Sequence, residues 1–497
     1  MSRMSKPARI GLYSIGLKAY WSQFPGLRER LLGYGGFIRD KLSENNRVHY
    51  FGMVEDEFTG LAAGEFFAEK NVDIVFLHAA TYCTSASVMP VHQVCGAPVV
   101  VLNLQPAAAM NYAATGTAEW LANCVACVVP EIVNALERCG IEARTVSGLL
   151  GMDKEKSSPG AAADENTADR PEAQAAWREI MDYASAASVK RSLLGARFGF
   201  LGDNYSGMLD LYSDFTLLQK SFRIHVEVLE MCTLADLVDT VTEEEIGEKL
   251  KTIRDFFVIG GGSASDPLAG APDEESLRWS ARVAVAQEKL TDAYQLDALS
   301  YYYHGASDNL YERIGAGLIM GNSLLTALGI PCAGEADIKT SVSMKICDLL
   351  GTGGSFCEIV AADYNHGTIL MGHDGPFHVG IAADKPFLRG MKLYHGKRGS
   401  GISVEAKVRP GPITLLGVTQ NAGGRIKCII SEGMAVDEEI LAIGNTQTHV
   451  KFRLPIDDYY GRWLREAPIH HFAMSVGHNS GVFKKVAELL GLDWVEI

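Results

Sequence analysis

Positive charge is scarce in this sequence of 497 residues, which has 45 lysines and arginines against 60 aspartates and glutamates and a formal net charge of -15. No cluster of basic residues stands out against that balance. A phosphate backbone is bound mainly through lysine and arginine, so this composition argues against a nucleic-acid partner. We therefore expect a globular protein whose partners do not include nucleic acid.

Long apolar runs and a secretion signal are missing as well. The longest segment without Asp, Glu, Lys or Arg covers residues 74–118, and it contains histidines, prolines and the amides Asn103 and Gln105. The apolar stretch that begins at Ile10 is interrupted by Lys18, and no small-residue cleavage site follows it. We expect a cytoplasmic protein without a membrane partner, in which residues 74–118 form a buried core and one wall of a site.

Cysteine is too sparse for a disulfide framework, with ten residues in the whole chain. Cys124 and Cys127 form a C-x-x-C, but no second pair stands near enough in sequence to complete a zinc site. We interpret the cysteines as reduced and buried, and this pair as structural and helical.

The apolar segments that are present predict three domains. In residues 9–151, β-rich runs alternate with helical patterns, which is typical of a parallel sheet covered by helices, and a second such alternation begins at Arg197. After about Gly375 the runs become short and alternating. The sequence thus predicts an α/β fold: two doubly wound α/β domains, residues 1–194 and 195–345, followed by an antiparallel, barrel-like β domain, residues 346–497.

Parallel sheets bind ligands at the carboxyl ends of their strands. Three amides occupy such positions: Asn103 and Gln105 in the first domain, and Asn204 after the first strand of the second domain. Gln23 follows the first strand of the chain. Tyr302 ends a later predicted strand and suits stacking on a ligand ring, although aromatic runs in strands mostly pack in the core.

The densest polar cluster lies in the C-terminal half. Glu335, Glu358 and His373 each stand near glycines and beside apolar sequence, a setting typical of side chains that face a cavity from the end of an element. His478 stands in a Gly-His-Asn-Ser stretch before the last helical pattern. Carboxylates with imidazoles suit Mn²⁺, Mg²⁺ or Co²⁺, but a single buried Glu or His is more often a structural group.

His470 and His471 form an adjacent pair. Neighbouring side chains in a strand point to opposite faces, so we do not expect both rings to serve one ion.

The cluster resembles the active-site segment of L-arabinose isomerases. Residues 333–340 read A-G-E-A-D-I-K-T, residues 354–358 read G-S-F-C-E, and residues 372–373 read G-H. Residues 200–204, F-L-G-D-N, resemble the family's G-D-N stretch, and residues 477–478 resemble its last histidine motif. The related L-fucose isomerases share the three-domain plan.

The resemblance implies an aldose–ketose isomerase with a divalent ion, Mn²⁺ first and Co²⁺ or Mg²⁺ next, held by Glu335, Glu358, His373 and His478. Glu335 and Glu358 would also act as acid and base. It further implies a homo-oligomer, a trimer or hexamer, in which first-domain residues of one subunit complete the pocket of another. The candidate substrate-binding residues in this chain are Gln23, Asn103, Gln105, Asn204 and Tyr302.

The chain also departs from the arabinose isomerase pattern. Where those enzymes have a histidine in an F-H-T-Q-F-N stretch of the first domain, this chain has Asn103. The last motif has one histidine followed by Asn479 where the family has a pair, and residues 20–26 differ from the family's short loop. We therefore expect a pentose or 6-deoxyhexose as substrate, without assigning L-arabinose.

Isomerisation moves a carbonyl between C1 and C2, which needs either proton transfer by a carboxylate or a hydride shift. A hydride shift needs two ions or a strongly polarising site, and the ligands in this sequence suffice for one ion, so we expect proton transfer through a cis-enediol.

Two other functions also fit parts of the sequence. A non-catalytic sugar-binding protein would have two α/β lobes with polar strand ends, but not the β-rich last third. A nicotinamide-dependent sugar oxidoreductase is suggested by residues 258–263, V-I-G-G-G-S, which lack the third glycine of a dinucleotide-binding loop.

Overall fold

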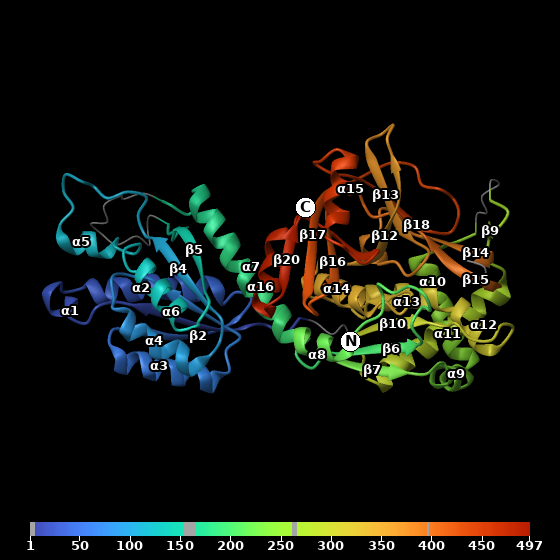
Figure 1. Cartoon of the computed structure of the whole chain (residues 1–497), viewed down its shortest axis with the longest axis horizontal. Coiled ribbons are helices and arrows are strands. Elements are labelled where there is room, and N and C mark those ends of the chain that lie inside the picture. The colour runs from blue at the N-terminus through green and yellow to red at the C-terminus, as the bar shows by residue number, and fades with distance from the viewer. Residues whose placement is uncertain (1–4, 154–165, 261–265, 395–396) are drawn as a thin grey trace. The chain divides into compact units, whose positions relative to one another are not determined.

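A computed structural model describes residues 5–153, 166–260, 266–394 and 397–497 of the chain. It divides into two compact units, Lys6–Arg191 and Ser192–Ile497, which are described separately. In Figure 1 the first unit runs from blue to teal and the second from green to red.

The first unit is built on one parallel sheet with the strand order β2-β1-β3-β4-β5. Its strands are β1 (Arg9–Ile15), β2 (Arg47–Val54), β3 (Ile74–His78), β4 (Val99–Gln105) and β5 (Ala143–Leu149). Strand β3 is buried along its whole length, as the uninterrupted apolar run predicts for the centre of a parallel sheet. The helices of this unit are α1 (Tyr20–Gln23), α2 (Leu27–Leu42), α3 (Glu57–Lys70), α4 (Ser85–Cys95), α5 (Thr117–Ala122), α6 (Val129–Arg138) and α7 (Pro171–Leu193).

The second unit begins with a smaller parallel sheet in the order β11-β10-β6-β7. Its strands are β6 (Arg197–Gly202), β7 (His225–Leu229), β10 (Ala298–Tyr302) and β11 (Cys332–Ala333). The helices are α8 (Phe215–Phe222), α9 (Met231–Asp239), α10 (Glu243–Phe256), α11 (Glu274–Ala293), α12 (Leu310–Ala316), α13 (Leu318–Ala327) and α14 (Ile338–Leu349).

The C-terminal sheet closes on itself. Seven strands follow the order β16-β19-β12-β13-β18-β17-β20, and β16 also pairs with β17. All pairings are antiparallel except that of β17 with β20. The strands are β12 (Ser355–Asp363), β13 (Thr368–His373), β16 (Gly411–Gln420), β17 (Ile426–Val436), β18 (Thr446–Lys451), β19 (His471–Val476) and β20 (Asp493–Glu496), with helices α15 (Ile456–Arg465) and α16 (Ser480–Leu490). The expected fold class is therefore confirmed.

A small sheet joins the two halves of the second unit. A hairpin of β14 (Phe387–Tyr394) and β15 (Lys397–Glu405) pairs with the short strands β8 (Val258–Ile259) and β9 (Ala269–Gly270). The glycine-rich motif of residues 258–263, which suggested a dinucleotide-binding loop, thus begins as strand β8 at the edge of this sheet. Its residues 261–263 lie outside the described residues.

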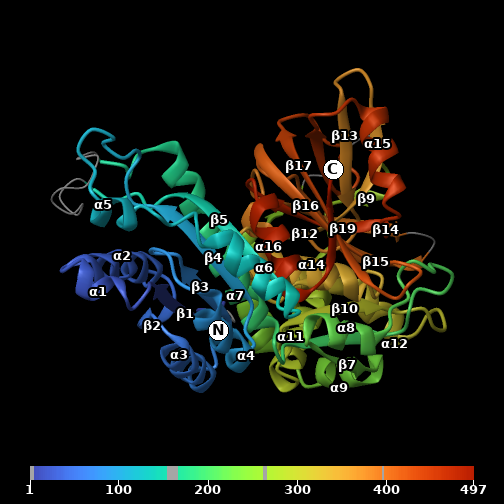
Figure 2. The ribbon, with the colours of Figure 1, turned by 60° about the vertical axis from the view of Figure 1, so that its left-hand side comes forward.

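One continuous core runs through the whole second unit, from Leu201 in β6 to Met474 in β19. Helix α14 lies at its centre, in contact with β10 on one side and with β16 and β19 on the other, as Figure 2 shows. Because the core is shared, the expected boundary at residues 345–346 stays a prediction, as do the other domain limits.

The cysteines correct one expectation. Five are buried, but Cys127, Cys139 and Cys232 are exposed. Cys124 and Cys127 lie in the turn between α5 and α6 instead of within a helix. Across the described ranges, no helix has the length and apolar character needed to cross a membrane.

Candidate metal centre

Helix α14 starts at a buried aspartate that does more than cap it. The side chain of Asp337 accepts hydrogen bonds from the backbone N–H and the hydroxyl of Thr340, which satisfies the first turn of the helix. Its Oδ2 also accepts a hydrogen bond of 3.0 Å from Nδ1 of His471, the first residue of β19. Burial raises the pKa of Asp337, but these donors, His471 foremost, outweigh it and lower the pKa to about 2. Asp337 is therefore a carboxylate that orients a histidine.

Glu335 is presented by a strained turn between β11 and α14. Glu335 and Ala336 have φ angles of 55° and 57°, a left-handed conformation that costs non-glycine residues about 1–3 kcal/mol each. Two backbone hydrogen bonds stabilise this turn, one from Ala336 N–H to Tyr301 O and one from Asp337 N–H to Gly334 O. Such strain persists where the surroundings impose it, and here it places a carboxylate beside the histidines.

Glu358 and His373 come from neighbouring strands of the C-terminal sheet. Glu358 in β12 stands opposite His471 of β19 on one side and Gly372 of β13 on the other. Gly372 has no room for a side chain, because a Cβ there would lie 1.8 Å from the carbonyl oxygen of Thr446. His373 follows as the last residue of β13, so strand pairing brings Glu358, His373 and His471 together.

The rings of His373 and His471 face each other through their Nε2 atoms, 3.2 Å apart. Each ring has its Nδ1 against an aspartate, at 2.6 Å from Asp374 and 3.0 Å from Asp337. Burial lowers the pKa of His471 despite the opposing effect of Asp337, which favours the neutral ring at neutral pH, and the hydrogen bond to Asp337 places the proton on Nδ1. The Nε2 of His471 therefore presents a lone pair toward the second imidazole.

This arrangement fits a divalent cation. Histidine ligands typically donate their second ring nitrogen to a carboxylate, as His471 does here. Two nitrogens that each lie about 2.1 Å from one ion are roughly 3.0–3.4 Å apart at tetrahedral or octahedral angles, which matches the 3.2 Å separation. Ligand atoms of two triads lie within 4.8 Å of one another: Glu335, His470 and His471, and Glu358, His373 and His471.

Both triads share His471, and its single Nε2 lone pair can bind one ion only. The two triads are therefore parts of one centre and cannot hold two ions through this ring at once. Phe356 packs against both imidazoles, with ring centroids 4.6 Å from His373 and 4.3 Å from His471, and keeps the rings in place.

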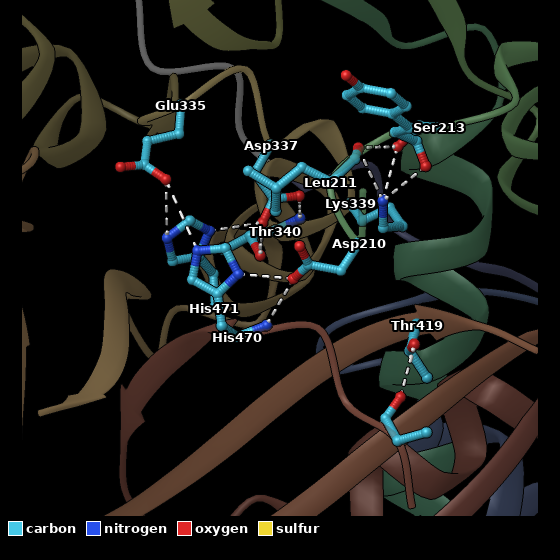
Figure 3. Close-up of polar contacts among 12 residues, drawn as sticks. Asp210, Leu211, Ser213, Glu335, Asp337, Lys339, Thr340, Thr419, His470 and His471 are labelled. Carbon is cyan, nitrogen blue, oxygen red and sulfur yellow. Dashed lines mark hydrogen bonds and ion pairs between the residues drawn. The ribbon is translucent and has the colours of Figure 1, made fainter. Parts of the chain in front are cut away.

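His470 lies at the outer edge of the centre. Its Nδ1 donates to Asp210 at 2.6 Å, and its Nε2 lies 3.6 Å from a Glu335 oxygen, as Figure 3 shows. Burial lowers the pKa of His470, but Glu335 and Asp210 raise it to about 9. For Glu335, burial raises the pKa, while His470 and the other two histidines lower it below its usual value. At neutral pH the chain thus holds Glu335 as a carboxylate beside a cationic ring.

The expectation that His470 and His471 point to opposite faces is wrong. Strand β19 begins at His471, so His470 lies before the strand. The alternation of side chains between the two faces of a strand therefore does not apply to it. The two ring centroids are 3.9 Å apart, and both Nε2 atoms lie 3.6 Å from Glu335. No sequence signal marks this boundary beyond Pro468 two residues earlier.

His478 lies away from this centre. It follows β19 by two residues, its side chain is 59% exposed, and it pairs with Glu432 at 2.8 Å. Neither described triad includes His478. Of the four residues expected as ligands, the structure brings together Glu335, Glu358 and His373, and it adds His471.

A cavity of about 680 Å³ opens beside the centre, lined by Glu335, His373 and Asp374. Tyr302, at the end of β10, lines the same cavity and stacks on Tyr205 with ring centroids 4.2 Å apart. The remaining wall includes apolar side chains from α13 and the β14–β15 hairpin: Leu318, Ile319, Met391 and Ile402.

The other expected substrate contacts lie elsewhere. Asn204 is exposed just after β6, next to Tyr205. In the first unit, Gln23 is exposed at the end of α1, Asn103 donates to Ser147, and Gln105 donates to the carbonyl of Ala107. Their part in ligand binding stays a prediction.

Comparison with known proteins supports a distant relationship. No family model matches the chain. It is 23% identical to the L-arabinose isomerase of Oceanobacillus iheyensis over 336 residues, 66% of this chain and 68% of that protein. It is also 23% identical to the L-arabinose isomerase of Shewanella baltica over 343 residues, 64% of this chain and 63% of that protein. The chain spans about two thirds of the length of these relatives, and its similarity to L-arabinose isomerases is at the level of a superfamily.

The centre predicts which histidine matters for metal binding. His471→Ala should weaken Mn²⁺ binding by about 100-fold or more, because removing even the partner of a ligand typically costs 10–100-fold. His478→Ala should change the dissociation constant less than about threefold, since its ring pairs with Glu432. Equilibrium dialysis of both variants checks this, and the reverse order of effects would contradict the assignment.

Proposed function

We propose that this chain is a metal-dependent aldose–ketose isomerase acting on a pentose or 6-deoxyhexose. The observation that carries the proposal is the pair of carboxylate-oriented imidazoles facing each other beside Glu335 and Glu358 at the wall of a cavity. The distant similarity to L-arabinose isomerases supplies the reaction type.

Glu335, Glu358, His373 and His471 are the residues that would hold the ion. His471 replaces His478 in this set because it is the histidine common to both triads. Two carboxylates with two imidazoles favour Mn²⁺, with Co²⁺ or Mg²⁺ as alternatives. When bound, such an ion supplies Lewis-acid stabilisation of the charge that develops on the sugar oxygens.

Glu335 and Glu358 would also move the proton. Glu335 is held as a carboxylate at neutral pH, as a base must be. One of the two glutamates would take the proton from C2 of the aldose as the C1–C2 double bond forms, and would return it to C1. The other would move a proton from O2 to O1, so that the cis-enediol becomes the ketose with no net gain or loss of protons. Since both triads share His471 and so suit a single ion, proton transfer is favoured over a hydride shift, which needs two ions or a strongly polarising site.

The cavity suits an uncharged sugar. Its described lining includes the carboxylates of Asp308, Glu312, Glu335 and Asp374 and no lysine or arginine. A phosphate or carboxylate on the substrate would be repelled there. Tyr302 and Tyr205 offer ring faces for the apolar side of a sugar, and the apolar side chains in the lining suit a deoxy carbon.

Asn204 and the first-unit residues Gln23, Asn103 and Gln105 remain the candidates for further sugar contacts. Gln105 ends β4, Asn103 lies two residues before that end, and Gln23 follows β1, all near the carboxyl ends of strands, where parallel sheets bind ligands. They would complete the pocket of a neighbouring subunit in a homo-oligomer, a trimer or hexamer.

Removal of the ion provides the first test. Dialysis against a chelator should abolish conversion of an aldose to a ketose, and Mn²⁺ should restore it more fully than Mg²⁺. A panel of aldopentoses and 6-deoxyhexoses, with their 5- or 6-phosphates as matched controls, identifies the substrate by the ketose formed. Turnover of a phosphorylated sugar alone, or full activity without metal, would contradict the proposal.

Replacement of the glutamates tests the proton transfer. Glu335→Gln and Glu358→Gln keep an oxygen ligand and the side-chain volume but remove the proton acceptor, so kcat should fall by about 10³-fold or more in at least one variant. Glu432→Gln, which changes a glutamate outside the centre, is the control and should keep wild-type kcat.

The same variants can be read in D₂O. The wild-type product should gain deuterium at C1, because a carboxyl proton exchanges with solvent between removal and return. Complete retention of the substrate hydrogen, together with wild-type kcat in both Gln variants, would remove the glutamates from the proton path.

A further inference from the structure

Lys339 lies in the first turn of α14, and its side chain binds a neighbouring loop. Lys339 is only 2% exposed, and its Nζ donates to the carbonyl oxygens of Leu211 at 3.0 Å and Tyr212 at 3.4 Å and to Oγ of Ser213 at 2.8 Å. A buried ammonium is costly unless its donors are satisfied, and here three acceptors serve three donors. All three acceptors belong to the loop of residues 203–214 between β6 and α8, named here the Asp210 loop.

The Asp210 loop touches the metal centre and the cavity. Asp210 accepts two hydrogen bonds from His470, from the backbone N–H at 3.1 Å and from Nδ1 at 2.6 Å. Five residues earlier, Tyr205 stacks on Tyr302 in the cavity wall. Figure 3 shows Lys339 bound to the loop at Leu211 and Ser213, while Asp210 reaches the other way to His470.

We propose that Lys339 is a positioning residue: by anchoring the Asp210 loop, it fixes Asp210 against His470, His470 against Glu335, and Tyr205 against Tyr302. The kinetic part of this inference rests on the proposed isomerase function. The first turn of α14 then orders both neighbouring histidines, His471 directly through Asp337 and His470 indirectly through Lys339 and the loop.

A purely space-filling role would not need a lysine. Methionine has a similar length, packs well in irregular interiors and carries no charge to desolvate. What lysine adds is three donors, and all three go to backbone or hydroxyl oxygens of one loop. The amine therefore acts on the position of the loop.

Helix α14 contains its own control. Lys345 is also 2% exposed, and its Nζ donates to Gly329 O at 2.8 Å and to Asp348 Oδ2 at 2.8 Å, away from the Asp210 loop. Lys339→Met and Lys345→Met remove the same charge from the same buried helix, and only the first removes the anchor.

The experiment measures loop order, metal binding and kinetics of the full-length protein. In Lys339→Met the amides of residues 207–213 should exchange with D₂O about tenfold faster or more, and kcat/KM for the aldose should fall about 30-fold. The dissociation constant for Mn²⁺ should rise less than in His471→Ala, since the four proposed ligands are retained and only a neighbour of Glu335 is displaced. Lys345→Met should show wild-type loop exchange and kcat/KM.

Asp210→Asn tests the contact between the loop and His470 without removing the Lys339 anchor. This variant keeps the Lys339 anchor, so loop exchange should stay as in wild type, while kcat/KM should fall by no more than in Lys339→Met. The double variant should be no worse than Lys339→Met, because Asp210 acts through His470, which the loosened loop has already displaced. If Lys339→Met does not fold, Ser213→Ala, which removes the closest acceptor, should loosen the loop in the same direction.

The inference is overturned if Lys339→Met and Lys345→Met have the same loop exchange and the same kcat/KM. If Lys339→Met does not fold, wild-type loop exchange in Ser213→Ala overturns it. The proposed function is tested separately. If the wild-type protein with Mn²⁺ converts no aldose of the panel, the proposed function is wrong, but the loop-exchange comparison still tests whether Lys339 anchors the loop. A loosened loop with unchanged kcat/KM would also overturn the positioning role.

Discussion

The buried hydrogen bond between Asp337 and His471 is the contact on which the candidate site depends. One carboxylate caps α14, the helix between the two sheets of the second unit, and at the same time fixes a ring on β19. Both side chains are fully buried. The bond directs the Nε2 lone pair of His471 toward His373 and Glu335, so the position of the helix, the strand and the ligand atoms is set by one group.

Long-range strand pairing explains which parts of the site were predictable from sequence. Glu335, Glu358 and His373 stand in glycine-bordered stretches that resemble motifs of L-arabinose isomerases, and in the structure they belong to the two triads that share His471. His471 was missed because its role depends on where β19 begins, one residue after His470, and on pairing with β12 across more than one hundred residues. His478 stands in a similar local stretch, but the chain turns it toward Glu432.

The fold was easier to predict than the site because periodicity is a local property. Alternating β-rich and helical runs in residues 9–151 and again from Arg197 indicated two parallel sheets, and short alternating runs after Gly375 indicated an antiparallel one. The structure confirms the parallel sheets and shows a mostly antiparallel last sheet. The left-handed backbone at Glu335 and Ala336 had no such signal, since neither residue is a glycine and the conformation is imposed by contacts with β10. The proposed roles of Gln23, Asn103 and Gln105 would require contacts with another subunit, which local patterns do not specify.

The location of the ion tests the central claim most directly. Crystals of the Mn²⁺-loaded protein, measured at the manganese absorption edge, should give one strong anomalous peak within about 2.0–2.4 Å of Nε2 of His373 and His471 and of carboxylate oxygens of Glu335 and Glu358. A peak at His478 and Glu432, or two peaks of equal height at the centre, would contradict the account of a single ion held around His471.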